Sequence, residues 1–154
     1  MLESPSIVQC AQQATAVIHL TIAREQCPQM MGPAIAEVKA ALAAQGMLAA
    51  GPVFSHHLIM PSAIVDFEIG VPLTEAIRPV GRVEAGQLPA TRVARTVYRG
   101  GYQGLGAAWA EFNAWIAAQG HRPAASLWEC YIVGPGADPA ADNWRTELNR
   151  PLLD

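Results

Sequence analysis

The chain repeats itself at an interval of 74 residues, and this duplication restricts its possible folds more than any other feature. The tetrapeptide Ala-Ala-Gln-Gly at residues 43–46 returns at residues 117–120 (117 − 43 = 74). Before each copy, three apolar side chains are spaced three and then four positions apart: Ile35, Val38 and Leu42 in the first half, Trp109, Phe112 and Ile116 in the second. This spacing places them on one face of a helix, which would end at Gly46 or Gly120. The two halves therefore predict the same structural unit.

Each unit is predicted to contain a strand, one long helix and two further strands. The first strands are expected at about residues 16–24 and 91–99, and the helices at about 31–45 and 103–119. The closing strands are expected at about 53–59 with 63–71, and at about 126–133 with 144–149. The two pseudo-repeats then cover about residues 14–75 and 88–153, and residues 80–83 of the bridge at 79–89 could add a short edge strand.

Neither unit is large enough to bury its own sheet well, so the two are expected to pack together. We therefore predict a single domain over residues 1–154 of the α+β class. It would contain two antiparallel sheets related by a pseudo-two-fold axis, one long helix per half, and a central ligand cleft where the sheet edges meet. Because this arrangement is already an internal pseudo-dimer, we expect a monomer or a weak dimer.

Composition and charge exclude several classes of protein. Hydrophobic residues make up 51% of the chain and charged residues 15%, which is typical of a globular protein rather than a disordered one. The net charge of −3 gives no reason to expect direct nucleic acid binding. We find no apolar run long enough to span a membrane and no secretion signal at the start of the sequence. A cytoplasmic location is the resulting expectation.

The residues that commonly bind metals are not arranged for it. The three cysteines, Cys10, Cys27 and Cys130, are odd in number and widely spaced, which argues against a disulfide scaffold and a structural zinc site. His56 and His57 are adjacent, but neighbouring residues in a strand point to opposite faces and cannot chelate one ion together. No phosphate-binding loop is recognisable. We expect neither a metal nor a cofactor.

The strand around Glu129 carries the leading candidate for a functional site. Alternation puts Glu129 and Tyr131 on one face, and Trp128 and Cys130 on the other, which we expect to pack beneath the second helix. Glu129 would then face the other half of the protein. A carboxylate among apolar neighbours is costly to bury, and such groups concentrate at functional sites. The competing interpretation is a solvated sheet edge or an ion pair with Arg145.

Four further residues complete the candidate site. Ser55 and His57 occupy the positions of the first half that correspond to Glu129 and Tyr131. Tyr102 and Trp144 are the aromatic residues expected nearest the cleft, whereas Trp109 and Phe112 match the apolar helical face and are expected in the core. A carboxylate surrounded by aromatic rings attracts organic cations.

These segments together resemble the GyrI-like small-molecule-binding family. The resemblance covers about residues 16–152 and is carried by the order and spacing of Arg-Gly-Gly-Tyr-Gln-Gly-Leu-Gly at 99–106, Trp-Ile-Ala-Ala-Gln-Gly at 115–120, Trp-Glu-Cys-Tyr at 128–131, Asp-Pro at 138–139, Trp-Arg-Thr-Glu-Leu at 144–148, and Val-Asp-Phe-Glu-Ile-Gly-Val-Pro at 65–72. It implies two strand-helix-strand-strand units with the ligand between them. It also implies that Glu129 meets cationic or polar parts of the ligand, with Tyr131 beside it. His57 departs from the family pattern, in which a Tyr is common.

Family members often serve as effector domains of multidrug-sensing regulators. Since little sequence precedes the first predicted strand, this chain is similar to the stand-alone members. The resemblance favours a binder of amphipathic or aromatic, cationic compounds. A second possibility is a hydrolase of strained, electrophilic rings, with Glu129 and Tyr131 as catalytic residues. A third is a protein-interaction module with a protein partner, such as a gyrase inhibitor.

Overall fold

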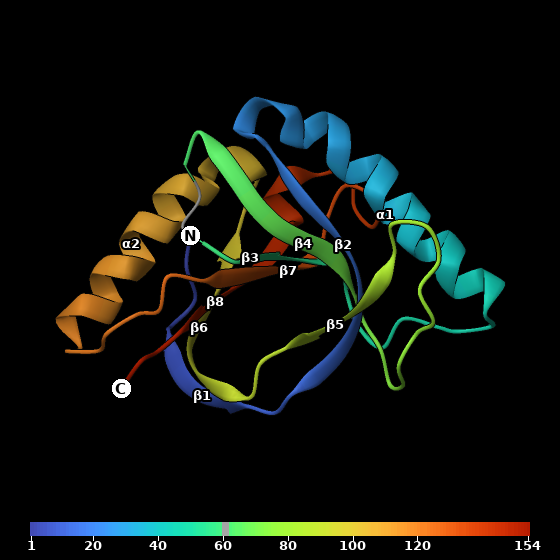
Figure 1. The fold of residues 1–154 in the computed structure, drawn as a ribbon. Helices are drawn as coiled ribbons and strands as arrows, with labels where there is room; N and C mark the ends of the chain where they lie inside the picture. The colour runs from blue at the N-terminus through green and yellow to red at the C-terminus, as the bar shows by residue number, and fades with distance from the viewer. Residues whose placement is uncertain (60–61) are drawn as a thin grey trace.

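The computed structural model describes residues 1–59 and 62–154 (Figure 1). Eight strands are present: β1 (Ser6–Cys10), β2 (Gln13–Ala23), β3 (Phe54–His57), β4 (Ile64–Pro72), β5 (Glu84–Leu88), β6 (Thr91–Arg99), β7 (Leu127–Val133) and β8 (Arg145–Pro151). The long helices are α1 (Cys27–Ala44) and α2 (Leu105–Ala118), and three 3₁₀ turns cover Arg24–Gln26, Tyr102–Gly104 and Ala141–Asn143. The turn expected between β3 and β4 includes Met60 and Pro61, which lie outside the described residues.

All eight strands belong to one antiparallel sheet in the order β1-β6-β8-β7-β3-β4-β2-β5. The prediction of two sheets was therefore wrong, because β3 and β7 pair directly and join the halves at the centre. In this pairing Ser55 lies opposite Glu129, and Tyr131 donates its backbone N–H to the carbonyl of Val53 at 2.9 Å. From the centre of the sheet outward, the first half contributes β3, β4 and β2, and the second half contributes β7, β8 and β6. This matching order agrees with the predicted unit but does not test its duplication.

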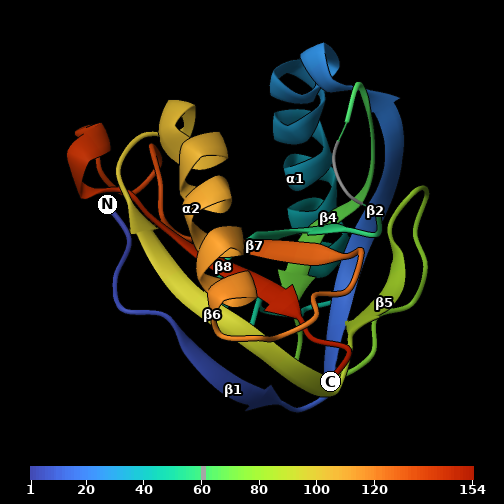
Figure 2. The same ribbon diagram turned by 90° about the vertical axis from the view of Figure 1, so that its left-hand side faces the viewer.

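The sheet is strongly curled, and both helices lie on its outer face (Figures 1 and 2). One core cluster joins α1 to β2 and β4, with Val38, Phe67 and Ile69 at its centre. A second joins α2 to β6 and β8 through Phe112 and Leu148. In Figure 2 the two helices stand side by side with β7 between them.

The opposite face of the sheet has its own apolar cluster, which contains Trp128, Phe54 and Val17. The sequence placed Trp128 and Cys130 beneath the second helix, and the structure reverses that assignment. Alternation shows which residues share a face but not which face meets the helices. The residues that face α2 from β7 are therefore those on the Glu129 side.

The chain segments outside the predicted units also form strands. The bridge contributes the edge strand β5, which pairs with β2 but begins just after the expected residues 80–83, where Val80 and Val83 form only an isolated bridge. At the other edge β1 pairs with β6. No helix within the described residues is long and apolar enough to cross a membrane.

Candidate functional site

A cavity of about 1030 Å³ lies between the two helices, above the central strands β3 and β7. It exists because α1 and α2 each pack on their own half of the sheet and leave the centre uncovered. Five of the six residues proposed from the sequence line it: Ser55, His57, Tyr102, Glu129 and Tyr131. Among the described residues, no cluster of three or more His, Cys, Asp or Glu side chains could hold a metal ion.

The cavity has two walls built from matching positions of the two halves. Eight pairs of lining residues are each 74 positions apart: Pro28 and Tyr102, Met31 and Leu105, Gly32 and Gly106, Ile35 and Trp109, Lys39 and Asn113, Val53 and Leu127, Ser55 and Glu129, His57 and Tyr131. The backbone positions therefore correspond, but the side chains differ. The second-half wall is aromatic and carries the carboxylate, whereas the first-half wall is mostly aliphatic.

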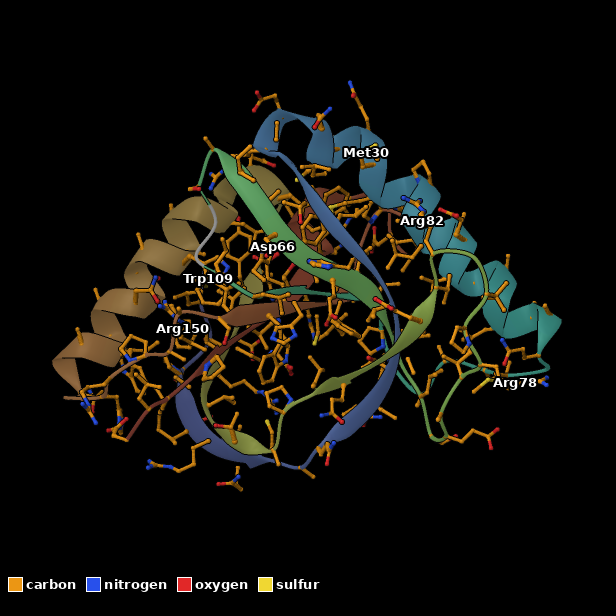
Figure 3. The ribbon with its side chains drawn as sticks, viewed as in Figure 1. Met30, Asp66, Arg78, Arg82, Trp109 and Arg150 are labelled. Carbon is orange, nitrogen blue, oxygen red and sulfur yellow. The ribbon has the colours of Figure 1, made fainter. Side chains whose placement is uncertain are left out.

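Glu129 lies on the floor of the cavity and is held by two neutral donors. The indole N–H of Trp109 donates to its Oε2 at 2.6 Å, and the hydroxyl of Tyr131 donates to its Oε1 at 2.9 Å. Trp109 points from α2 toward the centre of the molecule (Figure 3). Arg145 is not a partner, because no ion pair among the described residues joins it to Glu129. The ion-pair interpretation of Glu129 is therefore wrong for the described residues.

Tyr131 extends this contact into a row of hydrogen bonds across the cavity floor. Its hydroxyl lies 2.7 Å from Oγ of Ser55, and that Oγ lies 3.5 Å from Nε2 of His57. Since the Tyr131 proton goes to Glu129, the Ser55 hydroxyl must donate to Tyr131. Ser55 is then left to accept from His57, and Nδ1 of His57 has no partner among the described residues.

The environment shifts the pKa values of three of these groups. Burial raises the pKa of Glu129, although the hydrogen bonds from Trp109 and Tyr131 oppose the shift. Burial raises the pKa of Tyr131 well above its usual value, and the neighbouring Glu129 carboxylate adds to this. Burial lowers the pKa of His57 to about 4. His57 is therefore neutral near pH 7.

The shift at His57 predicts acid sensitivity of the fold. Its pKa falls from 6.5 to about 4 on folding, so below pH 6.5 the unfolded chain binds the proton more readily than the folded one. Between pH 6.5 and 4 we expect this residue alone to lower the free energy of unfolding by about 3 kcal/mol. Urea titrations at several pH values should therefore show a flatter pH profile for His57→Gln. If His57→Gln showed the same pH dependence of stability as the wild-type protein, the lowered pKa of His57 would be contradicted.

The two aromatic candidates have different positions. Tyr102 lines the cavity and meets Tyr131 edge-on, with ring centroids 5.8 Å apart. Trp144 does not line the cavity, but packs on Tyr102 at 4.9 Å and donates its indole N–H to the carbonyl of Asp138. It supports Tyr102 from behind rather than facing the cavity.

The sequence analysis missed Trp109, which it assigned to the core. Phe112 is fully buried as expected, but Trp109 is only partly buried and binds Glu129. A buried indole needs an acceptor for its N–H, and its position opposite the carboxylate strand was the available signal. Phe67 was missed as well. Its ring stacks on His57 at 5.1 Å and forms part of the cavity floor.

The cavity also explains a glycine that packing does not require. Gly106 is in the first turn of α2 and lines the cavity, and a Cβ there would meet no atom within 4 Å beyond its chain neighbours. Since glycine destabilises a helix relative to alanine, Gly106→Ala should raise the free energy of unfolding by about 0.5–1 kcal/mol in chemical denaturation. A loss of stability instead would mean that the space at Gly106 is occupied.

Comparison with known proteins identifies the family. The model of the GyrI-like small molecule binding domain matches residues 3–152. No curated protein matches the chain significantly in sequence. Among solved structures, the C-terminal domain of EcmrR has a TM-score of 0.86 at 14% identity over 98% of each chain. EcmrR in its DNA complex has a TM-score of 0.82 at 16% identity, and the match covers 97% of this chain and 57% of that one.

Two further structures share the fold. SAV2435 bound to tetraphenylphosphonium has a TM-score of 0.67 at 14% identity, covering 97% of this chain and 94% of that one. A hydrolase from Listeria innocua has a TM-score of 0.60 at 13% identity, covering 96% and 91%. At these identities the likeness establishes the fold alone. The family model, however, spans nearly the whole sequence, and the chain therefore belongs to the GyrI-like small molecule binding domain family.

Proposed function

We propose that this protein binds aromatic organic cations in the cavity, with Glu129 as the residue that selects their charge. The observation that carries the proposal is that the Glu129 carboxylate has only neutral partners. Trp109 and Tyr131 donate to it, and no Lys, Arg or His lies within 4 Å of it among the described residues.

An anion in this position is poorly compensated. Removing a carboxylate from water is costly, and hydrogen bonds from neutral donors recover only part of that cost. A bound cation would supply the missing opposite charge. A strongly hydrated ion would lose much of its hydration to enter, whereas an organic cation brings apolar surface into an apolar cavity.

The surrounding rings support an aromatic ligand. Trp109, Tyr131 and Tyr102 stand beside the carboxylate, and aromatic faces attract cations within about 6 Å of the ring centre. Ser55 and His57 would supply polar contacts at the floor, and Trp144 would hold Tyr102 in place. SAV2435, which shares the fold, is bound to such a cation, tetraphenylphosphonium.

The test uses two ions of nearly the same shape and opposite charge. Tetraphenylphosphonium and tetraphenylborate would be titrated separately into the protein, with calorimetry and tryptophan fluorescence as readouts. We expect saturable binding of the cation and much weaker binding of the anion. Equal affinity for the two would show that the cavity selects shape rather than charge, and no binding of either would refute the proposal.

A second candidate function is hydrolysis of a strained electrophilic ring. The row from Glu129 through Tyr131 and Ser55 to His57 favours it, because a carboxylate with a raised pKa is a better proton acceptor for water. Glu129 would take a proton from water as the water oxygen bonds to a ring carbon and the bond from that carbon to the ring heteroatom breaks. Tyr131 would protonate the heteroatom, and Glu129 would then pass its proton to Tyr131 along their hydrogen bond. A solved structure of a Listeria hydrolase shares the fold. Mass spectrometry of electrophilic compounds incubated with the protein would detect a gain of one water.

The duplication remains part of the proposal. The matching positions of the lining residues support an origin of both halves from one unit. A designed chain that carries two copies of one half would test this origin: folding would support it, and failure to fold would count against it. A role as a protein-interaction module stays a prediction from the resemblance.

A further inference from the structure

The two walls of the cavity differ in charge at one pair of matching positions. Lys39 on α1 corresponds to Asn113 on α2, and both line the cavity. Asn113 is already engaged, because Nη1 of Arg150 donates to its carbonyl oxygen at 2.7 Å. Lys39 has no carboxylate within 4 Å among the described residues. The first-half wall thus presents a cation to the cavity and the second-half wall does not.

Lys39 is the single lysine of the sequence, so its place on the cavity is not one instance of a lysine-rich surface. Arg24 adds a second positive charge at the start of the same wall. Its Nε donates to the carbonyl of Ser62 at 2.8 Å, and its side chain lines the cavity. The wall opposite Glu129 therefore carries one basic residue just before α1 and another in the second half of that helix.

Lys39 and Glu129 do not form an ion pair with one another, because no contact within 4 Å joins them among the described residues. Glu129 is held against α2 by Trp109, whereas Lys39 projects from α1, and the cavity separates the two helices. Helices in contact lie about 8–10 Å apart, so the axes of α1 and α2 are separated by more than about 10 Å. A ligand that spans this gap meets an anion at one end and a cation at the other.

We propose that the cavity takes zwitterionic ligands, with a cationic aromatic portion held against Trp109 and Glu129 and an anionic group held by Lys39 on the facing wall. This inference rests on the proposed function and specifies the class of ligand. The aliphatic side chains of Met31 and Ile35 line the wall between Lys39 and the cavity floor, and would contact the apolar part that joins the two charges. A ligand that carries only a positive charge would have a charged partner on the second-half wall alone.

The experiment compares two forms of one dye. A rhodamine with a free carboxylate is zwitterionic, and its ethyl ester is a cation of nearly the same shape. Fluorescence polarisation would measure the affinity of each for the wild-type protein, Lys39→Gln and Arg78→Gln. Arg78 is exposed and lies at the periphery of the molecule, so its variant removes the same charge outside the cavity (Figure 3).

We expect the wild-type protein to bind the acid about fivefold more tightly than the ester, as for one partly exposed ion pair. Lys39→Gln should bring that ratio close to one while leaving the ester affinity unchanged, and Arg78→Gln should retain the preference. Equal affinities in the wild-type protein, or a ratio that survives in Lys39→Gln, would overturn the inference while the ester still bound. If neither dye bound although tetraphenylphosphonium did, the inference would be overturned and the proposed function would stand. If tetraphenylphosphonium did not bind either, the proposed function itself would fail.

Discussion

Glu129→Gln is expected to weaken the binding of tetraphenylphosphonium by about 100-fold, close to 3 kcal/mol. The substitution keeps the length of the side chain and an oxygen that can accept from Trp109 or Tyr131, but it removes the negative charge. Because burial already limits how well that charge is solvated, its attraction for a cation is little screened. Isothermal titration calorimetry of both proteins measures the difference.

Glu129→Gln should increase the stability of the fold, although it weakens cation binding. Since burial raises the pKa of Glu129 on folding, the folded chain holds its proton more tightly than the unfolded one. The stabilisation by this residue is therefore full below the unfolded-state pKa and is lost as pH rises through the folded-state pKa. Glu129→Gln should accordingly unfold at a higher urea concentration than the wild-type protein at pH 7, with a smaller difference near pH 4.

A variant that binds more weakly but folds more stably cannot be explained by misfolding. Glu84→Gln is the matched control, because Glu84 is exposed on the edge strand β5 and lines no part of the cavity. It should leave cation affinity and stability unchanged. Undiminished binding of tetraphenylphosphonium by Glu129→Gln would remove Glu129 from the site and leave the rings of Trp109 and Tyr102 as the source of affinity.

The order of helices and strands could be predicted because helical spacing and strand alternation are both local signals. The helical spacing around Val38 and Phe112 and the alternation along residues 126–133 depend only on neighbouring residues. Residues 6–10 were missed, since β1 is a short edge strand whose partner β6 lies more than 80 residues away. Short segments of this kind gain their structure from pairing rather than from their own pattern.

The joining of the halves into one sheet could not be predicted in this way. It depends on pairing between β3 and β7, and the four residues of β3 carry no periodic signal that identifies a partner. Five of the six candidate residues nevertheless line one cavity. They come together because β3 and β7 pair in a register that places Ser55 opposite Glu129, two positions that are 74 residues apart. What the repeat could not show was that this face meets the helices, and so Trp109 was assigned to the core.

Gly70→Ala is expected to lower the free energy of unfolding by about 3 kcal/mol or more. A Cβ at this position would lie 1.9 Å from the backbone carbonyl oxygen of Ala16 and 2.9 Å from a methyl group of Val17. Both residues are fully buried on the neighbouring strand β2, so neither can move without separating β2 from β4. Chemical denaturation followed by circular dichroism would measure the loss.

The contrast with Gly106→Ala makes this prediction specific to the close approach of two strands. Both variants add one methyl group in place of a hydrogen, yet one meets backbone atoms and the other open space. Their stability changes should therefore have opposite signs, and equal changes would mean that the register of β2 and β4 is wrong. Because β4 also pairs with β3, which carries Ser55 and His57, any separation of the strands is transmitted to the cavity floor. Gly70→Ala should then weaken cation binding even under conditions in which it remains folded, whereas Gly106→Ala should disturb neither strand.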